Sequence, residues 1–109
     1  MFIPDQGDII FLDFEPSIGK EITKRRPALV LSRRAFNSHT NLAIVAPATS
    51  TIKSMGLESR LSVNMKTSGA VLIAQLKSFD YAERKVEFIE KAPNAIIREA
   101  LKKAAPIVS

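Results

Sequence analysis

The chain has 109 residues, of which 46% are hydrophobic, so it is not intrinsically disordered and is expected to form a single domain. It contains no cysteine, which excludes a disulfide framework and a thiolate metal site and fits a cytoplasmic location. Its formal net charge of +5 favours a polyanionic partner. Residues 1–8 lack the pattern of a signal peptide, and no apolar run approaches the roughly 20 residues of a membrane helix, so no membrane association is expected.

The first half of the sequence predicts three β-strands separated by polar loops. Residues 9–14 are rich in β-branched and aromatic side chains, as strands are. Pro27 has no N–H to donate to a neighbouring strand, so it is expected to open a second strand over residues 28–32. The third strand is predicted at 42–49, where Pro47 requires a sheet edge, a bend or a bulge.

The second half predicts further strands and then a helix. A short strand is expected at 60–63, a turn at 66–69, a strand covered on both faces at 70–76, and a half-exposed strand at 85–90. Beyond residue 93, apolar residues recur every three or four positions, which predicts an amphipathic C-terminal helix that covers the sheet and that Pro106 ends or kinks. The fold class is therefore mainly β with α: a small, strongly bent antiparallel sheet or barrel with a closing helix.

A polar, basic loop at 17–26 leads into the strand that Pro27 opens. Arg26 is expected at the junction of this loop with the sheet, where its backbone is held while its guanidinium faces the loop. Runs of charge are usually only solvated surface, so this simpler interpretation stays open.

The residue types of the chain restrict the chemistry that it can perform. The single histidine, His39, excludes a two-histidine acid–base pair and a histidine-rich metal site, and the scattered glycines form no phosphate loop. Arginine, threonine and glutamate suit RNA cleavage in which the 2′-hydroxyl of the substrate attacks the adjacent phosphorus. A guanidinium can contact two phosphoryl oxygens, a threonine hydroxyl can donate another hydrogen bond, and a carboxylate such as Glu21 can accept the proton. This scheme requires no metal ion or other cofactor.

Seven short segments together resemble the MazF/PemK toxins of bacterial type II toxin–antitoxin systems, in order and spacing, over essentially the whole chain. These segments are residues 7–10, 13–16, 19–21, 26–32, 36–37, 45–50 and 75–78. The resemblance implies a single toxin domain over 1–109 with an SH3-like (CcdB/PemK-like) β-barrel and a C-terminal helix, assembled as a homodimer. It also implies an mRNA interferase, a sequence-specific and metal-independent endoribonuclease that cuts single-stranded RNA to leave a 2′,3′-cyclic phosphate and a 5′-hydroxyl.

Matched by position, Arg26 and Thr49 are similar to the catalytic arginine and threonine of the family, and Glu21 to a loop glutamate that contributes in some members. The loops at 17–26 and 50–58 are expected to flank the RNA groove. The expected substrate-binding residues are Lys20, Lys24, Arg25, Lys53, Gln75 and Lys77. The resemblance further implies a cognate antitoxin whose disordered, acidic segment occupies the same groove.

The chain departs from the family pattern at Ala74, where many relatives have an aspartate before the glutamine. An acid–base role for that aspartate is therefore in doubt here, and no residue is assigned to protonate the leaving 5′-oxygen. Two alternatives stay open: a non-cleaving gyrase poison like the CcdB toxins, and a catalytically degenerate barrel that only binds RNA or an antitoxin. Thr49 could also be a strand-end threonine present for its β propensity.

Overall fold

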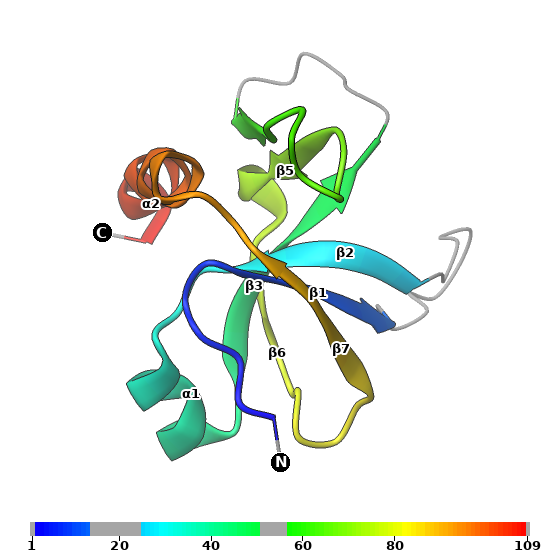
Figure 1. Ribbon diagram of the computed structural model, residues 1–109. Helices are drawn as coiled ribbons and strands as arrows, with labels where there is room; N and C mark the ends of the chain where they lie inside the picture. Colours follow the sequence, from blue (N-terminus) through cyan, green and yellow to red (C-terminus); the bar gives the residue numbers. More distant parts are fainter. Residues whose placement is uncertain (1, 14–24, 51–56, 109) are drawn as a thin grey trace, which may run out of the picture.

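The structure is a computed structural model that describes residues 2–13, 25–50 and 57–108 (Figure 1). In this part of the chain the strands form a seven-stranded sheet in the order β4-β5-β3-β2-β1-β7, with β6 also paired to β3, and every pairing is antiparallel. The elements are β1 (Asp8–Asp13), β2 (Arg25–Val30), α1 (Arg34–Thr40), β3 (Ala43–Thr49), β4 (Glu58–Arg60), β5 (Ala70–Leu72), the 3₁₀ turn η1 (Ile73–Gln75), β6 (Lys77–Phe79), β7 (Val86–Lys91) and α2 (Asn94–Val108).

Strand β3 lies in the middle of the sheet. Of the three alternatives expected at Pro47, the sheet edge is therefore wrong. On one side β3 pairs with β2, where Pro47 faces Ala28. On its other side, residues 43–45 pair with β6 and residues 48–49 pair with β5. Pro47 therefore lies where β3 changes partner on that side, and a residue without an N–H is tolerated there.

The single strand expected at 70–76 is wrong, because β5 ends at Leu72 and η1 follows it, with β6 beginning only at Lys77. The register of β5 places Ala48 opposite Val71, and continuing it would place Val45 opposite Ala74. Val45 instead faces Lys77. The turn η1 takes up the intervening residues, and it does so with Ile73 fully buried.

Two further boundaries differ from the prediction. Strand β2 begins at Arg25, so Pro27 is inside it. The pairing of β2 with β3 begins only at Ala28, so the missing N–H of Pro27 falls where β2 is paired with β1 alone among the described strands. Strand β4 ends at Arg60, earlier than expected, because the following residues form a turn in which Met65 donates its N–H to the carbonyl of Ser62.

Apolar residues on both faces of the sheet are buried in two clusters. On one face, the α2 residues Ala100 and Ala104 pack with Ile9 and Leu29, which confirms that the helix covers the sheet (Figure 1). The helix continues through Pro106, where only its last turn loses a backbone hydrogen bond. The second cluster contains Ile10, Leu12, Ala28, Val30, Ala43, Val45, Phe79 and Tyr81.

The ends of the sheet are β4, which pairs with β5, and β7, which pairs with β1. No pairing within the described ranges joins these ends, so a closed barrel stays a prediction. Across the same ranges, no helix is long and apolar enough to span a membrane.

The buried side chain of Asn37 fastens α1 to the rest of the fold. Its amide donates to the carbonyls of Pro4 and Ser32, and its carbonyl oxygen accepts from the hydroxyl of Ser32. The Tyr81 hydroxyl donates to the backbone carbonyl of Asn37 at 2.7 Å. Four separate segments of the chain therefore meet at one fully buried residue.

Replacing Asn37 with alanine is expected to lower the free energy of unfolding by about 2–4 kcal/mol, because it leaves buried carbonyl groups unpaired and opens a cavity. Urea denaturation followed by circular dichroism measures this change. The exposed Asn64 provides a matched control, and Asn64→Ala should change the free energy by less than about 0.5 kcal/mol. Equal effects of the two substitutions would contradict a fastening role for Asn37.

Candidate active site

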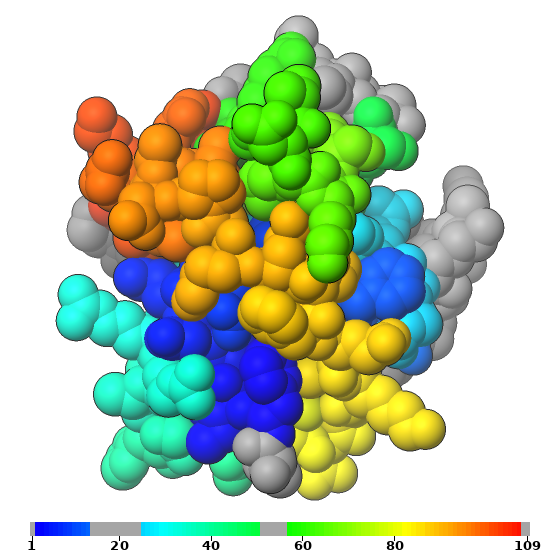
Figure 2. All heavy atoms as spheres, viewed as in Figure 1, coloured from blue at the N-terminus to red at the C-terminus, as the bar shows by residue number. Residues whose placement is uncertain are grey.

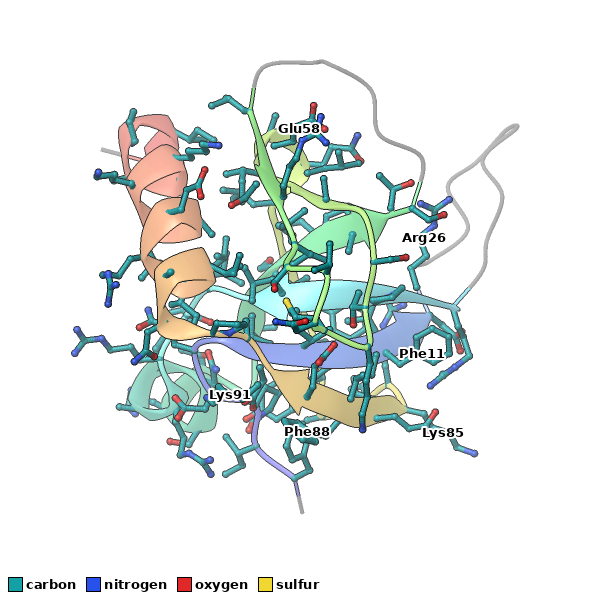
Figure 3. All side chains as sticks on the ribbon, turned by 45° about the horizontal axis from the view of Figure 1, so that its top comes forward. Phe11, Arg26, Glu58, Lys85, Phe88 and Lys91 are labelled. Atoms are coloured by element: carbon teal, nitrogen blue, oxygen red, sulfur yellow. The ribbon has the colours of Figure 1, made fainter. Side chains whose placement is uncertain are left out.

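The pairing of β2 with β3 brings Arg26 and Thr49 together. Ala28 faces Pro47 in an antiparallel register, and continuing that register by two residues places Arg26 opposite Thr49. Both side chains are half-buried, and both line a surface hollow of about 500 Å³. Figure 3 shows Arg26 at the end of β2 that lies far from α2.

Three parts of the fold form the walls of this hollow. They are residues 26–27 of β2 with residues 48–50 at the end of β3, the turn at 66–68, and Ile89 of β7. The described lining contains the cations of Arg26 and Lys66, four hydroxyl groups and no carboxylate. Such a surface attracts a phosphate group, because a guanidinium can donate to two of its oxygens while the hydroxyl groups donate to others.

The neighbouring Arg25 is held elsewhere. Its guanidinium forms ion pairs with Glu87 at 3.0 Å and Asp13 at 3.4 Å, and it stacks over the ring of Phe11 at 4.9 Å from the ring centre. These contacts attach Arg25 to β1 and β7, and it is absent from the lining of the hollow. The structure therefore does not bring this predicted substrate-binding residue to Arg26 and Thr49.

The remaining predicted site residues divide into two groups. Gln75 at the end of η1 and Lys77 at the start of β6 are exposed, and neither lines the hollow. Ala74, at the position where the resemblance leads us to expect an aspartate, is exposed on η1. The other four residues, Lys20, Glu21, Lys24 and Lys53, lie outside the described residues.

The wall at 66–68 is a part of the site that sequence reasoning missed. Glu90 of β7 accepts a hydrogen bond from the backbone N–H of Lys66 at 3.0 Å, and from the N–H and the hydroxyl of Thr67 at 2.8 and 2.7 Å. Partial burial raises the pKa of the Glu90 carboxyl, but the hydrogen bonds from Thr67 and Lys66 together outweigh this and hold the pKa below its ordinary value. The sequence indicates the turn but contains no signal for its partner on β7.

The same turn touches the strand end that carries Thr49. Gly69 has a φ of +101°, and a Cβ atom at this position would overlap the carbonyl oxygen of Thr49 and lie 2.7 Å from the Cα of Ser50. Only glycine fits both this backbone conformation and this close approach. The path of the turn and the position of Thr49 are thus linked.

Other potential sites in the described ranges fit the chemistry less well. No group of three or more histidine, cysteine, aspartate or glutamate residues is arranged there to hold a metal ion. A second hollow of about 540 Å³ runs along α2, lined by Ala95, Arg98, Glu99, Lys102 and Lys103, and this lining offers no hydroxyl group beside its cations. His39 is exposed in the last turn of α1 and does not line either hollow.

Replacing Gly69 with alanine is expected to destabilise the protein by more than about 2 kcal/mol, because the added methyl group meets backbone atoms that cannot move aside. Gly7→Ala is the matched comparison, since Gly7 also has a positive φ, of +94°, but its added methyl group would meet the flexible end of the Ile97 side chain. Thermal unfolding should therefore show the larger loss for Gly69→Ala. The reverse order would show that contact with the Thr49 carbonyl does not constrain the turn.

Comparison with known proteins agrees with the fold. A family model described as the PemK-like, MazF-like toxin of type II toxin–antitoxin systems matches residues 5–108. The endoribonuclease toxin MazF of Escherichia coli (strain K12) is 36% identical over 83 residues, which cover 76% of this chain and 74% of that protein.

Two solved structures from Deinococcus radiodurans are also similar. A crystal structure of MazF matches with a TM-score of 0.89 at 35% identity, covering 99% of this chain and 98% of that one. A chain in a crystal structure of MazE–MazF matches with a TM-score of 0.88 at 35% identity, covering 99% and 97%. The chain therefore belongs to the PemK-like, MazF-like toxins of type II toxin–antitoxin systems.

Proposed function

We propose that this chain, a MazF-like endoribonuclease toxin, cuts single-stranded messenger RNA at short sequences and uses the 2′-hydroxyl of the RNA as the nucleophile. The observation that carries the proposal is that Arg26 and Thr49 line one open hollow whose described lining contains no carboxylate. Such a lining favours the binding of a phosphate group. It also stabilises the additional negative charge that develops on the phosphoryl oxygens during the reaction.

In the proposed reaction, the 2′-oxygen forms a bond to the adjacent phosphorus and the bond from phosphorus to the 5′-oxygen breaks. The products are a 2′,3′-cyclic phosphate and a 5′-hydroxyl, and the leaving 5′-oxygen takes its proton from solvent water. The Arg26 guanidinium donates to the phosphoryl oxygens as their charge increases, and the Thr49 hydroxyl donates a further hydrogen bond. Glu21 accepts the proton of the 2′-hydroxyl. The protein groups alone supply the stabilisation, so no metal ion takes part.

The phosphates on either side of the cut bind the basic loops and strand ends around the hollow. We assign these contacts to Lys20, Lys24, Lys53 and Lys77, and we assign the contact to a base to Gln75. Phosphate contacts give affinity, and base contacts give the choice of sequence. Arg25 has no such role in the proposal, because its guanidinium is already paired with Glu87 and Asp13.

The finer architecture also belongs to this proposal. We expect the sheet to close into an SH3-like barrel and two chains to form a homodimer. We further expect an antitoxin whose acidic, disordered segment competes with RNA for the basic groove. A MazF with 35% identity has been crystallised with MazE, which supports this expectation. Such competition should weaken as salt screens the charges.

The exposed Ala74 favours a second candidate, a chain of this fold that binds RNA or an antitoxin but does not cut. It lacks the carboxylate that many relatives carry at this position, and a protein that binds RNA without producing new ends would fit this alternative. Family membership gives no comparable support to a gyrase poison.

The Arg26→Ala variant tests the proposal. It should lower the rate of cleavage of a long mixed-sequence RNA by about 100- to 1,000-fold while the protein stays folded, because a principal donor to the transition state is lost. Arg33→Ala, at the start of α1, removes the same charge from an exposed position and should leave the rate unchanged.

Mapping the new 5′ ends, with and without EDTA, identifies the cutting sequence and tests metal independence in the same experiment. The proposal expects 5′-hydroxyl ends and an unchanged rate in EDTA. Full cleavage by folded Arg26→Ala would overturn the assignment of this site, and RNA binding without any cleavage by the wild type would favour the second candidate.

A further inference from the structure

We propose that Glu90 is a positioning residue for RNA binding: it holds the turn at 66–68 so that Lys66 presents its ammonium group to the RNA beside Arg26 and Thr49. The effect on RNA binding rests on the proposed function, whereas the hydrogen bonds between the turn and Glu90 do not. Neither Glu90 nor Lys66 belongs to the residues that the sequence assigned to the site.

The geometry is that of one carboxylate holding a turn through three hydrogen bonds. Oε1 accepts from the N–H of Lys66, and Oε2 accepts from the N–H and the hydroxyl of Thr67. Thr67 is buried, with 6% of its surface exposed, so its two donors have little access to water. A charged acceptor binds such donors more strongly than a neutral one does. In Figure 2 the green surface of the segment that contains this turn lies against the gold surface of β7.

A bulge in β7 explains how one residue of this strand lines the hollow while the next residue binds the turn. Ile9 faces Glu90 and Ile10 faces Phe88, so Ile89 is the additional residue between two consecutive pairs. A bulge of this kind changes the direction in which its side chains point. Ile89 lines the hollow, and the next residue, Glu90, binds the turn.

The turn places Lys66 where a phosphate can reach it. Lys66 is exposed, lines the hollow that contains Arg26 and Thr49, and has no ion-pair partner among the described residues. Among the described residues, Lys66 is also the one whose charge helps to lower the pKa of Glu90. The ammonium group of Lys66 forms no ion pair with Glu90 in the described ranges, so it can bind a phosphate group of a ligand.

We call the three hydrogen bonds from the turn to Glu90 the clamp. The clamp and simple electrostatics predict opposite effects on RNA binding when the charge of Glu90 is removed. Glu90 carries a negative charge near a groove for a polyanion, so removal of that charge alone should strengthen RNA binding. If Glu90 instead positions Lys66, its removal loosens the turn and weakens RNA binding. Glu90→Gln separates the two effects because it removes the charge and keeps the size of the side chain.

The first experiment measures the dissociation constant of an RNA that carries a 2′-deoxy nucleotide at the cut position, which removes the nucleophile. Lys66→Ala should weaken binding by about 5- to 20-fold and reduce the slope of log K against log salt concentration by about one. Glu90→Gln should weaken binding by about 3- to 10-fold. The control Glu83→Gln, on an exposed residue of the corner between β6 and β7, should bind as tightly as the wild type or slightly more tightly.

The double variant Lys66→Ala/Glu90→Gln tests whether Glu90 acts through Lys66. It should bind no more weakly than Lys66→Ala alone, because the clamp has no function once the lysine is absent. With cleavable RNA, both single variants should raise KM while kcat stays within about twofold, which is not the pattern of a partly unfolded enzyme. Wild-type or tighter binding by Glu90→Gln, or additive losses in the double variant, would overturn the proposal.

The second experiment needs no RNA. Nuclear magnetic resonance should show the amide signals of Lys66 and Thr67 titrating together at a pH below the ordinary range of a glutamate, because the folded pKa of Glu90 is lowered. The hydrogen bonds therefore stabilise the turn above that pH and are lost as the pH falls through it. Amide signals that do not titrate with Glu90 would overturn the clamp itself.

The experiments also decide between the proposals if Glu90→Gln does not fold, or if the wild type binds RNA without cleaving it. If Glu90→Gln does not fold, Thr67→Val removes only the hydroxyl donor and keeps the charge, and it should weaken RNA binding by about twofold; unchanged binding would count against the clamp. If the wild type binds RNA with the expected Lys66 and Glu90 pattern but does not cleave it, the proposed ribonuclease activity fails and the clamp stands.

Discussion

The antiparallel pairing of β2 with β3 is the constraint on which the rest of the structure depends. It joins buried residues at its centre, where Leu29 faces Ala46 and Val30 faces Val45, all without exposed surface. Leu29 and Ala46 belong to the cluster on one face of the sheet, and Val30 and Val45 to the cluster on the other. Slippage by one residue would exchange residues between the two clusters, so the register is strongly fixed. The same register places Arg26 opposite Thr49 at the open end of the two strands. The geometry of the site is therefore a consequence of how the core packs.

The distribution of charge around the hollow follows from how the carboxylates are used. Asp13 and Glu87 are paired with Arg25, and Glu90 is hydrogen-bonded to the turn. These three acidic groups lie close to the site in the fold, yet none lines the hollow. Basic residues thus face the open space while acidic residues bind other parts of the protein, which is the arrangement that a polyanionic substrate requires.

Local sequence patterns predicted the elements whose formation depends on local properties. The strands β1, β3 and β7 and the amphipathic helix α2 agree with their predicted ranges to within one or two residues. The division of 70–76 could not be predicted, because η1 is needed only where one strand must pair with two others in different registers. For the same reason the hydrogen bonds from the turn to Glu90 were missed: they join residues that are 23 and 24 positions apart. The local pattern indicated Arg26 at the junction of loop and sheet, whereas the resemblance to a family indicated its catalytic role and that of Thr49.

The coupling between Arg26 and Thr49 in RNA cleavage is the most direct test of the account. Rates of cleavage would be compared for Arg26→Ala, Thr49→Val and the double variant, each first shown to be folded. Because both groups are proposed to stabilise the same phosphoryl group, the double variant should lose less than the sum of the single losses, by at least about 1 kcal/mol. Strictly additive losses, or a wild-type rate for Thr49→Val, would contradict the claim that the two side chains act together on one phosphate.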